Sequence, residues 1–203
     1  MHLIETLRHE GIRNEQVLEA MAKLPRHLFL EKAFEEWAYK NVAFPIGNEQ
    51  TISQPQTVAI QTSLLEVKKG DKILEVGTGS GYQACVLSLL GAKVYSIERQ
   101  SALYEKTDKF LRELGFGAIR TFLGDGYAGL PRFAPFDKIL VTAGATTLPE
   151  ELIHQLVVGG HLVIPIGGDA VQTMWRYTKV AEENIKRESF GKFKFVPFLK
   201  GTE

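Results

Sequence analysis

A glycine-rich turn constrains the fold of this sequence more than any other feature. The turn consists of Gly77, Gly79 and Gly81, and it lies between a short apolar run at 72–76 and a helical pattern at 82–90. Three glycines remove the side chains that would keep a ligand away from the backbone. A turn that leads from a strand into a helix is where doubly wound α/β proteins bind their ligands. We therefore expect such a sheet, with a ligand site at this turn.

From residue 72 onward the chain repeats this alternation of apolar strand and helix. Nearly continuous apolar strands separated by helices are typical of a mostly parallel sheet that is covered on both faces. Two later strands have no helix-length connection between them, which predicts antiparallel pairing at one edge of the sheet. The expected strands are 72–76, 93–98, 119–123, 137–142, 161–166, 173–180 and 193–199; the expected helices are 82–90, 101–114 and 149–157, with a turn at 159–160.

The residues before this alternation predict an N-terminal helical extension. Asn14 is a candidate N-cap of a helix that Pro25 ends, and a second helical stretch covers 30–39. Residues 41–55 are rich in turn formers and predict a loop, of which 45–55 are expected to form a lid, and a helix follows at 56–67. The expected division is a helical extension and lid at 1–55 and a single ligand-binding domain at 56–203.

The charge balance and the cysteine content exclude several classes of protein. Lys+Arg and Asp+Glu number 24 each, so no strong overall field attracts nucleic acid or anionic lipid. Cys85 is the only cysteine, which rules out an internal disulfide and a multi-cysteine metal site. No apolar run approaches the roughly 20 residues that span a bilayer, and the charged N-terminus does not resemble a signal peptide. We expect a cytoplasmic monomer with no metal, no nucleic-acid partner and no membrane anchor.

Two acidic residues follow the next two expected strands at the same edge of the sheet. Glu98 lies about 20 residues after Gly77, where a carboxylate can accept hydrogen bonds from both hydroxyls of a ribose. Asp125, between Gly124 and Gly126, can accept a hydrogen bond from the amino group of an adenine. Taken singly, each acid has an alternative explanation, a solvated charge at a strand end or an ordinary Asp-Gly turn. Together with the glycine turn, they indicate a ligand that carries adenosine.

The spacing of the glycines argues against a nicotinamide cofactor. The dinucleotide fingerprint is G-x-G-x-x-G, and Tyr82 occupies the place of its last glycine. S-adenosylmethionine fits better, because it carries adenosine and needs no phosphate clamp. A nicotinamide oxidoreductase and a non-enzymatic module that senses the cofactor or binds RNA remain as alternatives. Relative affinities for NAD, S-adenosylmethionine and RNA would separate these three hypotheses.

Motifs along nearly the whole chain support a narrower hypothesis. LEVGTGSGY (74–82), SIER (96–99), GDG (124–126) and APFDKILVTAG (134–144) are similar to the signature series of S-adenosylmethionine-dependent methyltransferases. Within that class, the T-I-S-x-P run at 51–55 and the V-P pair at 196–197 resemble those of protein-L-isoaspartate O-methyltransferases, as do LPRHLF (24–29) and GGHLVIP (159–165).

This resemblance implies a Rossmann-like methyltransferase fold and a role in protein repair. The family transfers a methyl group from S-adenosylmethionine to the free α-carboxyl of L-isoaspartyl residues in damaged proteins, and the ester cyclises to a succinimide that reopens partly as aspartate. The active-site serine of the family corresponds to Ser53, and 196–198 are expected to line the same cleft. Gln56 stands where some members have histidine. The cofactor contacts correspond to Thr51, Ile52, Ser53, Glu75, Gly77, Thr78, Gly79, Gly81, Glu98, Arg99, Asp125 and Gly126.

The chemistry of this reaction agrees with a sequence that has no evident catalytic base. The acceptor carboxylate has a pKa of about 3.3–3.7 and is already ionised near neutral pH. Ser53 can donate a hydrogen bond that holds this carboxylate in line with the methyl donor, although capping the helix that begins near Gln56 is an alternative use. We expect Arg26 and His27 to fix the N-terminal helices onto the domain. The alternative function is methylation of another carboxylate or of a small molecule.

Overall fold

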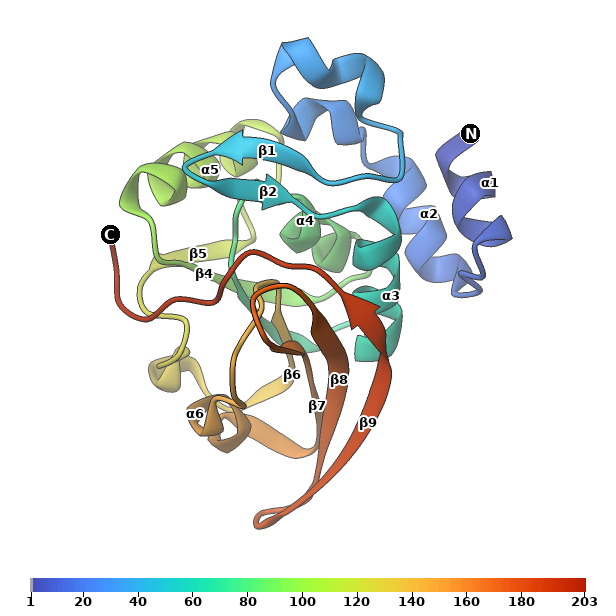
Figure 1. Cartoon of the computed structure of the whole chain (residues 1–203). Coiled ribbons are helices and arrows are strands. Elements are labelled where there is room, and N and C mark those ends of the chain that lie inside the picture. The colour runs from blue at the N-terminus through green and yellow to red at the C-terminus, as the bar shows by residue number, and fades with distance from the viewer. Residues whose placement is uncertain (1) are drawn as a thin grey trace.

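A seven-stranded sheet forms the centre of the molecule (Figure 1). The computed structural model describes residues 2–203. The strands of the sheet are β3 (Lys72–Val76), β4 (Lys93–Glu98), β5 (Arg120–Leu123), β6 (Phe136–Val141), β7 (Leu156–Gly167), β8 (Gln172–Ala181) and β9 (Asn184–Phe193). Their order is β5-β4-β3-β6-β7-β8-β9, parallel from β5 to β7 and antiparallel from β7 to β9. The predicted doubly wound α/β fold with an antiparallel edge is confirmed.

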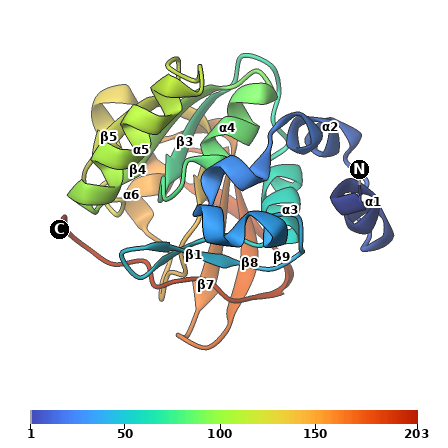
Figure 2. The ribbon, with the colours of Figure 1, turned by 90° about the horizontal axis from the view of Figure 1, so that it is seen from above.

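Helices cover the sheet on both faces, as the apolar strands require. Successive residues of β3 alternate between two hydrophobic clusters, with Ile73 in one and Leu74 in the other. The first cluster includes buried residues of α3 (Pro55–Leu65), α4 (Tyr82–Leu89) and α5 (Ser101–Glu113), and these helices lie over the sheet in Figure 2. The second cluster includes residues of α6 (Glu150–His154) on the opposite face.

The N-terminal extension contains two α-helices and two short 3₁₀ helices. Asn14 caps α2 (Glu15–Lys23), because its side chain accepts a hydrogen bond from the Val17 backbone N–H at 3.2 Å, as predicted. The preceding helix, α1 (His2–His9), lies beside α2 at the periphery (Figure 2). The helix expected at 30–39 is only a 3₁₀ helix, η2 (Lys32–Trp37). None of its residues is fully buried and only Phe34 packs against the core, so packing gives little support to a longer α-helix. The other 3₁₀ helix is η1 (Arg26–Phe29).

The prediction of an irregular loop at 41–55 was wrong, because this segment contains a β-hairpin. Strands β1 (Phe44–Gly47) and β2 (Gln50–Ile52) pair antiparallel and form a separate two-stranded sheet. Asn48 and Glu49 join them with φ of 51° and 56°, the left-handed backbone that tight hairpin turns require. The turn formers in this segment therefore mark the bend of a hairpin. The division of the chain into 1–55 and 56–203 stays a prediction.

Two expectations for the C-terminal part also need correction. The helix expected at 149–157 is only α6, and β7 begins at Leu156, before the turn expected at 159–160. The last strand is β9, and the residues from 194 onward form a tail in place of the strand expected at 193–199. Because β9 is an edge strand with mostly exposed residues, it lacks the apolar alternation by which strands are recognised.

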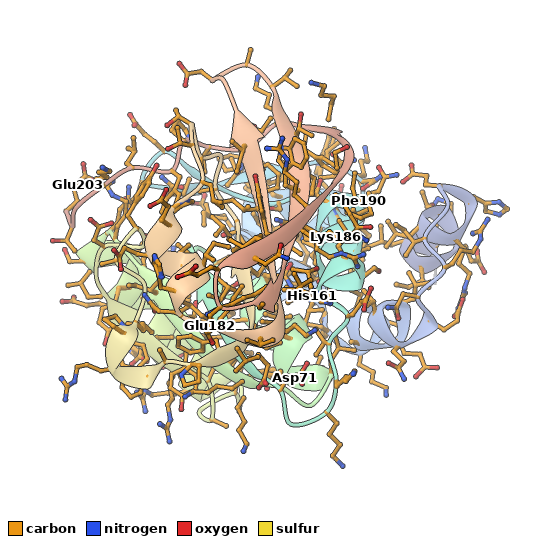
Figure 3. All side chains as sticks on the ribbon, turned by 90° about the horizontal axis from the view of Figure 1, so that it is seen from below. Asp71, His161, Glu182, Lys186, Phe190 and Glu203 are labelled. Carbon is orange, nitrogen blue, oxygen red and sulfur yellow. The ribbon has the colours of Figure 1, made fainter. Side chains whose placement is uncertain are left out.

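Ion pairs fasten the antiparallel edge of the sheet to the end of α3. Arg176 of β8 contacts Glu66 at 2.5 Å and Glu188 of β9 at 3.0 Å. Glu66 also lies 3.6 Å from His161, and Glu188 lies 3.5 Å from Lys186. Figure 3 shows His161 and Lys186 on the same side of the molecule. Because each exposed pair is worth at most about 1 kcal/mol, the network fixes the position of β9 more than it adds stability.

Candidate functional site

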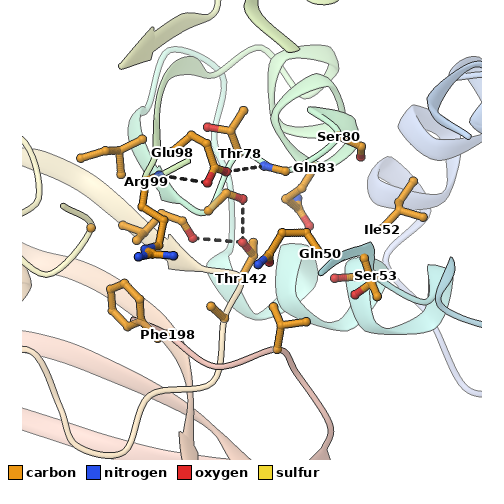
Figure 4. Close-up of a pocket in the computed structure, with 18 of the residues that line it drawn as sticks. Gln50, Ile52, Ser53, Thr78, Ser80, Gln83, Glu98, Arg99, Thr142 and Phe198 are labelled. Atoms are coloured by element: carbon orange, nitrogen blue, oxygen red, sulfur yellow. Dashed lines mark hydrogen bonds between the residues drawn. The ribbon is translucent and has the colours of Figure 1, made fainter. Parts of the chain in front are cut away.

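A pocket opens at the carboxyl ends of β3, β4 and β6, and residues of the β1–β2 hairpin and of the C-terminal tail also line it. Figure 1 shows where these elements lie in the fold. This cavity, the strand-tip pocket, has Glu98 and Arg99 on one side and Ile52 and Ser53 on the other (Figure 4). The tail residues 196–199 line it, in agreement with the expectation for 196–198. Its walls comprise 50–53, 76–80, 97–99, 126, 142–143 and 196–199, together with Val58, Tyr82 and Gln83.

Most of the predicted cofactor residues converge on this pocket. Those that line it are Thr51, Ile52, Ser53, Gly77, Thr78, Gly79, Glu98, Arg99 and Gly126. Glu75, Gly81 and Asp125 do not line it. The role of each residue in cofactor binding stays a prediction.

The glycine turn brings bare backbone to the wall of the pocket. Gly77 has a φ of 100°, and a Cβ atom there would lie 2.4 Å from Oγ1 of Thr142. That hydroxyl lies 3.0 Å from the carbonyl oxygen of Val76 and 2.8 Å from that of Gly77, and it donates to this pair (Figure 4). A side chain at position 77 would therefore be strained and would also break the link between the ends of β3 and β6.

The carboxylate of Glu98 is oriented by three backbone N–H groups. Its Oε2 accepts from Gly79 at 3.0 Å, and its Oε1 accepts from Arg99 at 2.9 Å and Gln100 at 3.1 Å. A carboxylate has about four lone-pair directions, so this one can still accept a hydrogen bond from a ligand hydroxyl. The carboxylate predicted to bind ribose is thus already positioned at the edge of the pocket.

Asp125 lies in a tight turn after β5, and its side chain is engaged within that turn. Its Oδ1 accepts a hydrogen bond from the Tyr127 backbone N–H at 2.9 Å. The neighbouring Gly126 lines the pocket, where a Cβ atom would lie 2.4 Å from Cγ1 of Val76 and 2.8 Å from the ring of Phe198. This close packing leaves no room for a side chain at position 126, which explains the glycine there. The contact of Asp125 with an adenine stays a prediction.

Glu75 is fully buried beneath the pocket. The Ser96 hydroxyl donates to its Oε2 at 2.5 Å, and the Ser96 oxygen lies 2.7 Å from the hydroxyl of Thr78, which lines the pocket. Burial raises the pKa of Glu75 to about 8; the Ser96 hydrogen bond opposes this rise, and the nearby Glu98 carboxylate adds to it. Glu75 therefore carries a proton at neutral pH. Through its hydrogen bond with Ser96, it helps to hold the hydroxyl of Thr78 in position at the pocket wall.

This raised pKa predicts how stability depends on pH. Between about pH 5 and 8 the folded protein keeps the proton on Glu75 while the unfolded chain releases it, so the free energy of unfolding falls as the pH rises. Glu75→Gln cannot ionise and should lose less stability over the same range. Urea unfolding of both proteins at several pH values measures this difference in slope, with the exposed Glu113→Gln as the control. Parallel curves for Glu75→Gln and the unaltered protein would contradict the prediction.

Ser53 faces the pocket just before α3 and does not cap this helix. The N-cap position is Gln54, and it makes no side-chain capping hydrogen bond. The backbone carbonyl of Ser53 accepts a 2.8 Å hydrogen bond from Nη2 of Arg26, which is fully buried and lies over the ring of Tyr82 at 4.9 Å. Burial lowers the pKa of Arg26 to about 10, so the guanidinium stays charged at neutral pH. Arg26 therefore ties the N-terminal extension to the backbone of Ser53.

The structure adds pocket residues that the sequence did not indicate. Gln83, on the first turn of α4, has an Oε1 that is buried without a hydrogen-bond partner among residues 2–203. Gln50 and Thr142 also line the pocket. No local pattern marks these residues, because long-range packing brings them to the strand tips.

A second cavity, of about 420 Å³, adjoins the strand-tip pocket on the side of Ser53. Four residues, Thr51, Ser53, Thr142 and Val196, line both cavities. The rest of the lining consists of Ala43, Gln54, Gln56, Thr57, Ala170, Val171 and 192–195. Ser53 therefore lies on a wall between two openings.

Among residues 2–203, no three or more His, Cys, Asp or Glu side chains gather where they could hold a metal ion. No helix in the same range is both long enough and apolar enough to cross a membrane.

Comparisons with known proteins agree with this geometry. The family model described as protein-L-isoaspartate(D-aspartate) O-methyltransferase (PCMT) matches residues 1–203. The chain is 56% identical over 198 residues to a protein-L-isoaspartate O-methyltransferase of Christiangramia forsetii, covering 98% of this chain and 92% of that protein. One from Flavobacterium psychrophilum is 55% identical over 198 residues, with the same coverage.

Solved structures show the same similarity. A structure from Plasmodium falciparum, described as this type of methyltransferase in complex with S-adenosyl-L-homocysteine, has a TM-score of 0.87 at 25% identity over 98% of each chain. Another protein-L-isoaspartate O-methyltransferase has a TM-score of 0.87 at 28% identity, over 97% of this chain and 64% of that chain.

Proposed function

The chain belongs to the protein-L-isoaspartate(D-aspartate) O-methyltransferase family, and we infer that the strand-tip pocket is where it carries out the reaction of that family. The enzyme uses S-adenosylmethionine to methylate isoaspartyl residues of damaged proteins, which begins their repair. The observation that carries the assignment of the site is the convergence of the glycine turn, Glu98 and Ser53 on one cavity.

The residues of the pocket fit S-adenosylmethionine. Gly77 and Gly79 leave the backbone open, and the oriented Glu98 carboxylate suits the hydroxyls of a ribose. The unpartnered Oε1 of Gln83 suits a cationic amino group, because a buried acceptor without a donor costs about 1–3 kcal/mol until it gains one. Phe198 offers an aromatic wall beside Gly126.

Alignment of the acceptor is the main task left to the protein. S-adenosylmethionine, when bound, supplies a methyl group activated by a sulfonium. The acceptor carboxylate is ionised near neutral pH, so it needs no general base. We assign Ser53 the role of donating a hydrogen bond to this carboxylate, and proximity and orientation can then contribute on the order of 7–11 kcal/mol. Ile52, which is buried next to it, helps to exclude water.

The second cavity is the route by which we propose that the damaged chain reaches Ser53. It opens beside Ser53 and shares Thr51, Thr142 and Val196 with the strand-tip pocket. A substrate can therefore present its carboxylate at the shared wall without entering the part of the pocket beside Glu98. Residues 192–195 of the tail and residues just before α3 line this cavity.

A paired methylation assay tests this function. One peptide contains an L-isoaspartyl residue, and its twin has the same sequence with a normal aspartyl residue. We expect methyl transfer from S-adenosylmethionine to the isoaspartyl peptide alone. Equal methylation of both peptides would rule out the repair function and favour a methyltransferase for another carboxylate or for a small molecule.

Two further properties remain part of the proposal. We propose that the protein acts in the cytoplasm, supported by its single cysteine, and that it acts as a monomer. Cell fractionation tests the first property, and sedimentation of the pure protein tests the second.

A further inference from the structure

Two charged residues line the second cavity, and both are cationic. They are Lys192, at the end of β9, and Lys194, in the tail that follows it. We propose that these two lysines make the enzyme prefer damaged sites at which an acidic side chain flanks the isoaspartyl residue. This inference rests on the proposed function and names the chemistry of the preferred substrates.

The two lysines share one side of the chain that borders the cavity. Exposed Lys192 and Lys194 alternate with Phe193, which is half-buried, and with Phe195, which is buried. Alternation with a period of two places the lysines on the same side of an extended segment. Because the next residue, Val196, lines both cavities, this segment leads directly to the wall that carries Ser53.

Neither lysine is neutralised within the described part of the chain. No ion pair of residues 2–203 involves Lys192 or Lys194. The remaining lining residues are uncharged, and they include the amides of Gln54 and Gln56. Asp169 precedes the lining residue Ala170 but does not itself line the cavity. The cavity therefore has a local excess of positive charge in a protein whose formal net charge is zero.

The position of this charge determines which part of a substrate it meets. One residue of an extended peptide spans at most about 3.3–3.6 Å, so the side chains next to an isoaspartyl residue at Ser53 fall within the adjoining cavity. An acidic flanking side chain would complete an ion pair with a lysine, whereas a basic one would be repelled. Since exposed pairs contribute about 0.2–1 kcal/mol, we expect a preference of about 1.4- to fivefold for each favourable flanking charge.

Matched isoaspartyl peptides test this preference. In one set the residue before the isoaspartate is Glu, Gln or Lys, and in a second set the residue after it varies in the same way. We expect kcat/KM to rank Glu above Gln above Lys in at least one set, mainly through KM. The ranking should weaken as salt is added to about 0.5 M, because salt screens exposed charges. If the three peptides of both sets react equally at low salt, the inference is wrong.

Charge reversal identifies the lysines as the cause. In the double variant Lys192→Glu/Lys194→Glu, the ratio of kcat/KM for the Glu and Lys peptides should invert. The control is Lys93→Glu, the same change of an exposed lysine at the opposite end of the sheet. An unchanged ratio in the double variant would overturn the inference, whatever the variant's overall activity.

The proposed function can fail separately from this inference. Methylation of the Gln-flanked isoaspartyl peptide, but not of its aspartyl twin, supports repair activity regardless of charge preference. If this repair activity is present but the rate does not depend on the charge of the flanking residue, only the role of the lysines is rejected.

Discussion

Glu98→Gln is expected to weaken the binding of S-adenosylmethionine by about 10- to 100-fold, because a hydrogen bond to a charged group contributes about 1.5–3 kcal/mol. The carboxylate accepts from Gly79 through one oxygen and from Arg99 and Gln100 through the other. A glutamine has only one acceptor oxygen, so its NH₂ group must face a backbone N–H in either orientation. The substitution therefore disturbs the glycine turn as well as the contact with ribose.

Isothermal titration of the cofactor product S-adenosylhomocysteine measures this loss without turnover. The control is Glu105→Gln, an exposed residue of α5 that undergoes the same change of charge. Thermal unfolding of the ligand-free proteins shows whether the fold survives. An unchanged dissociation constant in a folded Glu98→Gln variant would remove Glu98 from the cofactor site.

Ser53→Ala is expected to lower kcat by about 10- to 100-fold, because it removes one hydrogen bond to a charged acceptor. The affinity for S-adenosylhomocysteine should change much less. Since the backbone carbonyl of Ser53 accepts the hydrogen bond from Arg26, that link survives the loss of the hydroxyl. The variant should therefore remain folded, so that a change in turnover can be assigned to the missing hydroxyl.

Two variants sharpen this test. Ser53→Thr keeps a hydroxyl and should retain more activity than Ser53→Ala. Ser63→Ala removes a half-buried hydroxyl that hydrogen-bonds within α3, to the carbonyl of Ala59, and serves as the matched control. If Ser53→Ala melts the protein but leaves the specific rate of the folded fraction intact, the serine has only a structural role.

The centre of the fold was predictable from the sequence because local signals agree there. The apolar run at β4 is bounded by Gly91 and by the polar start of α5, and the predicted and observed strand limits coincide. The hairpin at 44–52 and the edge strand β9 were not predictable in this way. Strands β1 and β2 are short and β1 contains proline and glycine, and in β9 most residues face solvent.

The candidate site shows the same division between local and long-range information. Gly77 and Glu98 could be found because Gly77 directly follows β3 and Glu98 is the last residue of β4, and both strands are recognisable. Gln83 could not, because its place in the pocket depends on how α4 packs against the strand tips. Phe198 was expected in the cleft only through the resemblance to the family, because the packing of the tail decides its place. The Arg26–Ser53 hydrogen bond joins residues 27 positions apart, so no spacing rule indicates it.

The hydrogen bond from Arg26 to Ser53 has a consequence for engineering. A truncated fragment that began near α3 would lose the buried guanidinium that anchors the serine backbone. The first two dozen residues carry Arg26 into the interior and pack α2 against the same hydrophobic cluster as α3 and α4. The minimal catalytic unit of this enzyme therefore includes its N-terminal helices, and truncation is a poor route to a smaller methyltransferase.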